Sequence, residues 1–128
     1  MFFKKFLFVA VAFAIIACAL GENQLTMTQH QASAWEDGGQ GFSVWEVIIT
    51  NVCGKTIKDV TIVGESNFNL RNGTGDLWNL ELEASSANRF HLPSYVKEHG
   101  LAHNTSHSFG YINKGYQNAQ FSYCNIQY

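Results

Sequence analysis

The fold is decided by the stretch Trp35-Glu-Asp-Gly-Gly-Gln-Gly-Phe-Ser-Val-Trp-Glu-Val-Ile-Ile-Thr-Asn51. Its glycines supply the positive φ angles that a tight chain reversal needs, between the end of one strand and a longer second strand. After the turn, Trp45, Val47 and Ile49 share one face, because strand side chains alternate in direction. That face is wholly apolar and must be buried. The stretch therefore predicts a β-hairpin with a core stripe.

The opposite face of the same strand is mixed, since it carries Phe42, Val44 and Glu46 in alternation. A mixed face is typical of a surface that meets solvent or a ligand. Trp35 comes just before the glycine turn and Phe42 just after it. Both are therefore candidate surface aromatics.

Short strand signals recur along the rest of the chain, with turn residues between them. We expect strands over residues 25–35, 42–51, 56–63, 76–83, 89–92, 108–112 and 119–128. Aromatic and charged residues each make up 14% of the chain, which indicates a packed β-rich protein and excludes disorder. About seven short antiparallel strands without a convincing helix predict an all-β fold, a β-sandwich, in one domain over residues 22–128.

The first residues have the pattern of a secretory signal peptide. Two lysines precede the apolar run from Phe6 to Leu20, which is shorter than the about 20 residues that span a bilayer. Small residues then permit cleavage after Ala19 or Gly21. We expect residues 1–21 to be removed and the mature domain to be secreted, with no membrane partner. The alternative is an uncleaved N-terminal anchor.

Two cysteines remain after such cleavage, Cys53 and Cys124. A pair of cysteines in a secreted chain predicts one disulfide; the alternative is two buried free thiols. Asn72-Gly-Thr and Asn104-Thr-Ser are N-glycosylation motifs in polar, turn-like stretches. In a eukaryotic host both are candidate glycosylation sites.

Several other functions find no support in the sequence. The net charge of −2 and the lack of a basic stripe argue against nucleic acid as a partner. His99, His103 and His107 recur every four residues, but Gly100 interrupts any helix there, so we expect no metal site. The acidic residues mark no glycosidase pair, and no nucleophile elbow or phosphate loop is present. We therefore expect neither catalysis nor a cofactor.

A series of short segments resembles the CBM49 family of carbohydrate-binding modules. In order they are Trp35 before a glycine turn, Phe42 after it, Ile-Thr-Asn51, Thr-Ile-Lys-Asp-Val60, Leu-Trp78-Asn-Leu, Leu-Pro-Ser94 and Ser-Phe-Gly-Tyr-Ile112. Their order and spacing cover nearly all of the mature chain. The Leu-Pro-Ser segment, followed by a glycine loop and Gly-Tyr-Ile, is fairly specific.

The resemblance implies a β-sandwich that binds cellulose or a related glucan without catalysis, with chitin as a further candidate. Stand-alone members are secreted in amoebae and slime moulds, which implies an extracellular matrix or a cell, spore or cyst wall. The family's sugar-contacting aromatics map to Trp35, Phe42 and Trp78. Two departures are visible. The family often has Tyr at the position of Phe42, and it has Gly at the position of Asn79.

These residue types suit sugar binding. A flat aromatic ring matches the apolar C–H face of a pyranose, and amides, carboxylates and hydroxyls match its hydroxyl rim. Trp78 is ambiguous, because simple alternation with Leu80 and Leu82 turns it inward unless a bulge near Gly75 turns it out. Tyr111, Tyr116 and Tyr123 either extend a platform or pack at turns and edges. The alternative function is a structural or protein-interaction sandwich whose aromatics are buried; a small hydrolase is the third.

Overall fold

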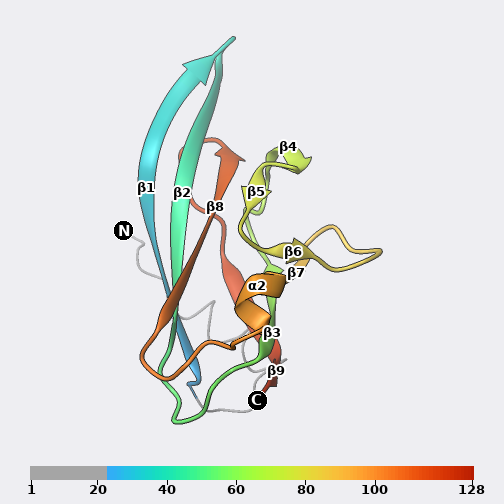
Figure 1. Ribbon diagram of the computed structural model, residues 1–128. Coiled ribbons are helices and arrows are strands. Elements are labelled where there is room, and N and C mark those ends of the chain that lie inside the picture. The colour runs from blue at the N-terminus through green and yellow to red at the C-terminus, as the bar shows by residue number, and fades with distance from the viewer. Residues whose placement is uncertain (1–22) are drawn as a thin grey trace.

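The computed structural model describes residues 23–128. The predicted signal peptide, residues 1–21, and its cleavage sites lie outside this part. The described residues form two four-stranded sheets packed face to face, which confirms the predicted β-sandwich (Figure 1). No helix in this part of the chain is long and apolar enough to cross a membrane.

The first sheet has the strand order β1-β2-β8-β5 and the second has the order β6-β7-β3-β9, with antiparallel pairing throughout. The first sheet comprises β1 (Leu25–Asp37), β2 (Gln40–Asn51), β8 (Ser106–Lys114) and β5 (Leu77–Trp78). The second comprises β6 (Glu81–Leu82), β7 (Arg89–His91), β3 (Asp59–Gly64) and β9 (Phe121–Gln127). A short strand, β4 (Arg71–Thr74), and one helical turn, α2 (Ser94–Lys97), complete the elements.

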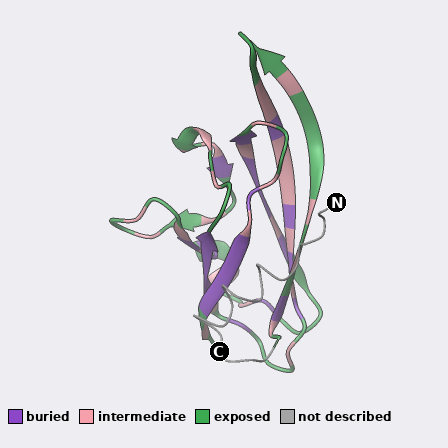
Figure 2. Cartoon of the chain, turned by 180° about the vertical axis from the view of Figure 1, so that it is seen from behind, coloured by how far each residue is buried: buried purple, intermediate pink, exposed green. Residues whose placement is uncertain are grey.

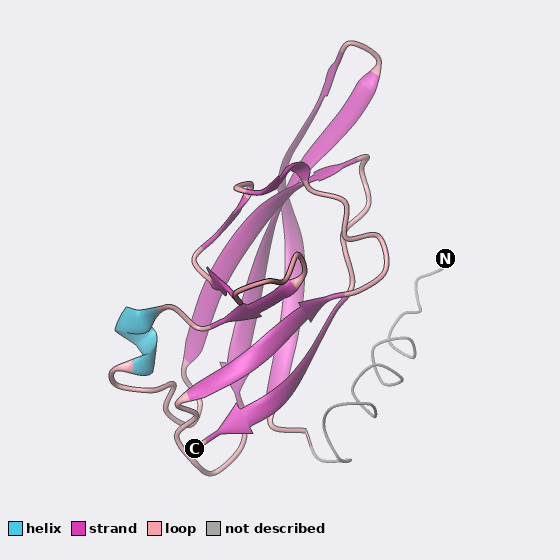
Figure 3. Cartoon of the chain, turned by 90° about the vertical axis from the view of Figure 1, so that its right-hand side faces the viewer, coloured by secondary structure: helices cyan, strands magenta, loops and turns pink. Residues whose placement is uncertain are grey.

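The predicted hairpin is formed by β1 and β2, which pair from Leu25 opposite Asn51 to Asp37 opposite Gln40. Gly38 and Gly39 make the reversal at φ angles of 59° and 83°. The end of the hairpin projects past the rest of the sandwich (Figures 1 and 3). Most residues near its tip are exposed (Figure 2).

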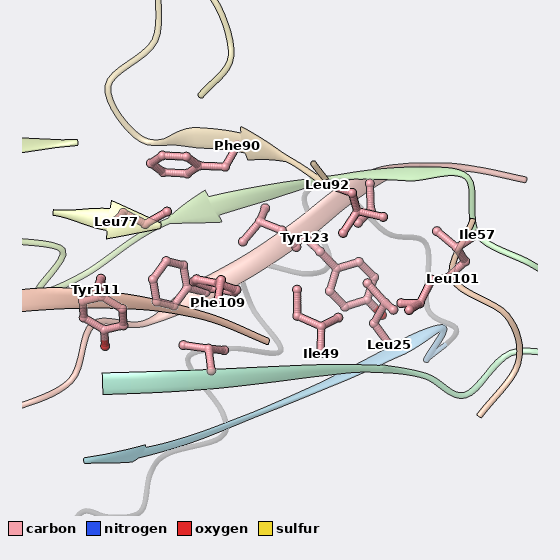
Figure 4. Close-up of a cluster of buried hydrophobic side chains, with 14 of the residues drawn as sticks. Leu25, Ile49, Ile57, Leu77, Phe90, Leu92, Leu101, Phe109, Tyr111 and Tyr123 are labelled. Atoms are coloured by element: carbon pink, nitrogen blue, oxygen red, sulfur yellow. The ribbon is translucent and has the colours of Figure 1, made fainter. Parts of the chain in front are cut away.

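The core lies between the two sheets and takes side chains from both (Figure 4). Val47 and Ile49 are completely buried, as the alternation predicts. Trp45 packs against this core but is only partly buried, and its indole N–H donates to the Ser43 hydroxyl at 2.8 Å. Tyr111 and Tyr123 are fully buried and therefore form no part of an exposed platform.

The strand predicted over residues 76–83 is wrong in one respect: the chain divides it between the two sheets. β5 pairs with β8 in the first sheet, and β6 pairs with β7 in the second. Asn79 lies at the crossover with φ at 72°, in the left-handed region where asparagine is tolerated better than most residues. The alternation therefore breaks after Trp78, and its side chain does not share a face with Leu80 and Leu82.

The predicted disulfide between Cys53 and Cys124 is absent, and both cysteines are free thiols. Cys53 packs against the core, with its Sγ 3.3 Å from the carbonyl oxygen of Lys55. Cys124 follows core residue Tyr123 on β9, so it points to the other side of the second sheet. There its Sγ lies 3.7 Å from Nη2 of Arg89. The Cys124 thiol is thus directed away from the core against which Cys53 packs.

Candidate functional site

The three predicted aromatics lie on one face of the first sheet. We call this face, which points away from the second sheet, the outer face. Val47 and Ile49 point inward, so Phe42, at an even-numbered position of the same strand, points outward. Trp35 is paired with Phe42, and Trp78 is paired with Gly110, which is itself opposite Glu46. The register therefore brings Trp35, Phe42 and Trp78 to the same side.

Trp35 and Phe42 form a cross-strand aromatic pair near the end of the hairpin. Their ring centroids are 5.5 Å apart with an interplanar angle of 31°. The guanidinium carbon of Arg71 lies 5.9 Å from the Trp35 ring, within the range of a cation–π contact. Arg71 is held by Asp76, to which its Nε donates at 2.7 Å. This hydrogen bond raises the pKa of Arg71 above its ordinary value, so its charge is constant.

Trp78 is 45% exposed and rests on a glycine. A Cβ atom added to Gly110 would come within 2.5 Å of Cζ2 of the Trp78 indole. Only glycine therefore lets the indole lie this close to the strand. The sequence left the orientation of Trp78 open; its side chain points outward, and the break in alternation comes from the crossover at Asn79 and not from a bulge near Gly75.

The surface between the two aromatic positions is mixed, in agreement with the predicted pattern. Val44, Ile48 and Ile112 are half-buried on the outer face. His30 Nε2 lies 2.7 Å from Glu46 Oε1, within hydrogen-bonding distance, with side chains 58% and 42% exposed. The outer face thus carries Trp35 and Phe42 at the hairpin end and Trp78 farther along, with apolar side chains and exposed hydrogen-bonding groups beside them.

The contacts of Asn79, the residue after Trp78, could not be read from the sequence, and they lead away from the outer face, because its partner Tyr95 also packs against inward-facing His107. Tyr95 on α2 is 59% exposed, and its hydroxyl donates to Oδ1 of Asn79 at 2.9 Å. Asn79 in turn donates from Nδ2 to the carbonyl of Ser108 at 2.8 Å. The departure from the family's glycine at Asn79 was visible in the sequence, but its partner lies 16 residues away.

Tyr116 is also exposed, at 54%, but lies elsewhere. A Cβ on Gly41 would meet the Tyr116 ring at 2.4 Å. Gly41 precedes outward-facing Phe42, so this contact is on the inner side of the hairpin. Tyr116 therefore does not extend the outer face.

The three recurring histidines do not converge. His99 is exposed beyond α2, His103 contacts the carbonyl of Cys53 through Nδ1, and His107 is buried with Nε2 2.7 Å from the carbonyl oxygen of Asn79. Within residues 23–128, no group of three or more His, Cys, Asp or Glu side chains is arranged to hold a metal ion.

A hollow of about 600 Å³ lies away from the outer face, between the segment that leads into β4 and the loop before β7. Its lining includes Phe68, Asn69 and Asn88, and its one carboxylate is Glu65. A glycosidase needs two carboxylates across the scissile bond, and this lining does not offer them.

Both glycosylation motifs are accessible. Asn72 is exposed beside Arg71, at the edge of the outer face, and Asn104 is exposed in the turn that precedes β8, with φ at 66°. Whether glycans occupy them stays a prediction.

Comparison with known families defines the class of the protein. The family model described as carbohydrate binding domain CBM49 matches residues 25–116, which is most of the chain and includes all three outer-face aromatics. The protein thus carries a non-catalytic carbohydrate-binding domain. The chain belongs to the CBM49 family, as the resemblance in its motifs indicates. No curated protein matches the chain.

Proposed function

We propose that the protein is secreted and binds cellulose or a related β-glucan through the outer face of its first sheet. The observation that carries this proposal is the common orientation of Trp35, Phe42 and Trp78. A β-glucan presents apolar C–H faces along a flat ribbon. The exposed Trp78 and the half-buried Trp35 and Phe42 can match such faces with their rings, and they lose little entropy when a ligand holds them.

The polar groups of the outer face support the same ligand. His30 and Glu46 are exposed at its centre, and Thr50 and Ser106 share a hydrogen bond of 2.7 Å farther along it. These groups are positioned to exchange hydrogen bonds with sugar hydroxyls. An open face suits an insoluble polymer better than a deep pocket, which would enclose only a chain end.

The predicted signal peptide and the two glycosylation motifs favour an extracellular place of action, in a matrix or a wall. Chitin presents a similar apolar face and is the second candidate polymer. A structural or protein-interaction role, without sugar binding, remains the competing class of function.

Retention on insoluble polysaccharide tests the proposal. The purified protein, residues 22–128, is mixed with microcrystalline cellulose, with chitin and with inert beads, and the unbound fraction is measured. We expect retention on cellulose that falls strongly in Trp35→Ala and Trp78→Ala. Tyr116→Ala is the matched control, because it removes an equally exposed aromatic from the inner side of the hairpin. If neither polymer retains the protein, the proposed function is wrong and the structural or protein-interaction role becomes the better explanation.

A further inference from the structure

Arg71 lies beside Trp35 in a fixed position. Its guanidinium carbon is 5.9 Å from the centroid of the Trp35 ring. Carbon atoms in direct contact are about 3.5–4.0 Å apart, so the guanidinium is not stacked on the centre of that ring. Asp76 holds the guanidinium through two hydrogen bonds, from Nε at 2.7 Å and from Nη2 at 3.2 Å. Arg71 is therefore oriented next to an aromatic ring without covering its centre.

The pair formed by Arg71 and Asp76 belongs to the outer face. Leu77 is buried and points inward, so its neighbours Asp76 and Trp78 point outward. The guanidinium of Arg71 lies where the Asp76 carboxylate binds it. Arg71 is thus on the same side of the sheet as Trp35, in agreement with its contact with that ring.

The same pair lies between the two aromatic positions along β8. Asp76 is joined to this strand, because its carbonyl oxygen accepts a hydrogen bond from the backbone N–H of Ile112 at 2.9 Å. Ile112 is midway between the residue of β8 that is opposite Phe42 and the residue of β8 on which Trp78 rests. A polymer chain that contacts both Phe42 and Trp78 therefore passes next to Arg71.

Part of the Arg71 guanidinium remains available to a ligand. The side chain is 33% exposed, and among residues 23–128 its Nη1 has no hydrogen-bond partner. Nη1 carries two N–H donors. Asp76 balances the charge of Arg71, so the pair adds donors to the outer face and no net charge. Such donors suit the hydroxyl oxygens of a neutral polysaccharide.

We propose that Arg71 is a further sugar-contacting residue, which donates a hydrogen bond from Nη1 to a hydroxyl of a glucan chain that lies between the Trp35–Phe42 pair and Trp78. This inference rests on the proposed function. The rings contact the apolar faces of the sugar units, and the equatorial hydroxyls of a β-glucan project sideways from those faces, toward a donor beside a ring. Because Asp76 already fixes the guanidinium, the bond costs little conformational entropy. Arg71 thereby joins two separate aromatic contacts into one continuous site.

The affinity for cellohexaose, measured by calorimetric titration, tests the inference. We expect Arg71→Ala to lower this affinity about threefold to tenfold, the effect of losing one hydrogen bond. Arg89→Ala is the matched control and should leave the affinity unchanged. Arg89 is the other arginine of the chain, is 37% exposed and lies 3.6 Å from a Glu83 oxygen, but it belongs to the second sheet. Thermal unfolding of each variant checks that the fold is retained.

Arg71→Met separates a direct hydrogen bond from packing beside the ring. This variant keeps a long side chain next to Trp35 and removes every donor. The inference requires Arg71→Met to lose as much affinity as Arg71→Ala. If Arg71→Met binds cellohexaose as tightly as the wild type, Arg71 only packs beside Trp35 and the direct contact is refuted.

Nuclear magnetic resonance of the guanidinium groups gives an independent test in the wild type. Addition of cellohexaose should shift the guanidinium resonances of Arg71 and leave those of Arg89 in place. If binding occurs and the Arg71 resonances do not move, the inference is overturned.

The remaining outcomes distinguish the two proposals. If the wild type binds cellohexaose and Arg71→Ala binds it equally well, the inference fails and the proposed function stands. If the wild type binds neither cellohexaose nor cellulose, the proposed function fails and the inference fails with it.

Discussion

The position of the Trp78 indole close to β8 depends on Gly110. Its missing side chain leaves room for the indole, since the three atoms nearest to an added Cβ all belong to Trp78. We expect Gly110→Ala to lift the indole from the strand and lower cellulose affinity about threefold to tenfold.

In Gly110→Ala, the stability should change much less than the affinity for cellulose, because Trp78 is partly exposed and free to move outward. The unfolding free energy should change by less than about 1 kcal/mol. Retention assays and thermal unfolding on the same sample measure both quantities. An unchanged affinity would show that the resting position of Trp78 is irrelevant to binding.

Tyr111 is the buried residue with the clearest polar role. Its hydroxyl donates to Gln29 Oε1 at 2.6 Å and accepts from the backbone N–H of Ala119 at 2.8 Å. We expect Tyr111→Phe to lower the unfolding free energy at pH 7 by about 1–3 kcal/mol, because the Ala119 N–H is left buried without an acceptor. Chemical denaturation measures the difference, and Tyr116→Phe serves as the exposed control.

The Tyr111 hydroxyl also makes the stability of the folded state depend on pH in the alkaline range. Burial raises the pKa of Tyr111 well above its ordinary value, so the folded state keeps the proton that the unfolded chain releases above about pH 10. The stabilisation by Tyr111 is thus complete below pH 10 and declines above it. The stability gap between the wild type and Tyr111→Phe should therefore narrow as pH rises from 9 to 11; a constant gap would contradict this account.

At the scale of elements, α2 depends on a carboxylate from β6. Glu81 Oε2 accepts from both the backbone N–H and the hydroxyl of Ser94 at 2.8 Å. These bonds lower the pKa of Glu81, so they are complete above its ordinary value of about 4.3 and are lost as pH falls through the lower value in the folded state. α2, which carries Tyr95, should therefore loosen in acid.

Nuclear magnetic resonance can follow this loosening at the Ser94 amide. We expect its chemical shift to titrate with a midpoint below about 4.3, and this titration to vanish in Glu81→Ala. Glu98→Ala, which removes an exposed carboxylate at the end of α2, should leave it in place. The melting temperature should change little in either variant, because exposed charged pairs contribute little to stability. A Ser94 titration that persists in Glu81→Ala would assign it to another group.

The hairpin could be predicted from sequence, and the crossover could not, for a physical reason. Between Trp35 and Asn51 the glycine turn and the alternating pattern agree, so local rules suffice. Between Asp76 and Glu83 the alternation is equally clear, but it reflects two strands in different sheets joined at a left-handed Asn79. Period-two rules assume a continuous strand, and they turned Trp78 the wrong way.

The contacts of Tyr95 are a second feature that could not be predicted from the sequence. Nothing in Ser94–Lys97 indicates the fixed position of Tyr95, because that position depends on contacts with Asn79 and His107. Those partners reach it only through the tertiary fold. Trp35 and Phe42, in contrast, meet across a turn that is local in sequence, which is why their pairing could be foreseen.

At the scale of the whole molecule, the sandwich is stabilised by its core without a covalent link between the sheets. Cys53 and Cys124 are free; Cys53 packs against the core, and Cys124 is directed away from it. We expect two thiols per protein of residues 22–128 to react with a thiol reagent after denaturation without reductant. We also expect reductant to leave the melting temperature unchanged. If the thiols react only after reduction, the predicted disulfide is present and this account is wrong.

The outer face is stiffer around Trp78 than along the hairpin, because the hairpin projects from the sandwich. Trp78 rests on Gly110 of β8, a strand whose other side packs against the core. Trp35 and Phe42 lie where the ribbon leaves the sheet, because Phe42 is opposite Lys114, the last residue of β8. Beyond them the ribbon extends past the other strands (Figure 1), where bending needs no rearrangement of the interior. Such a ribbon flexes out of its plane more readily than within it. On an uneven polysaccharide surface, the hairpin can therefore bend toward the polymer while Trp78 stays in contact with it.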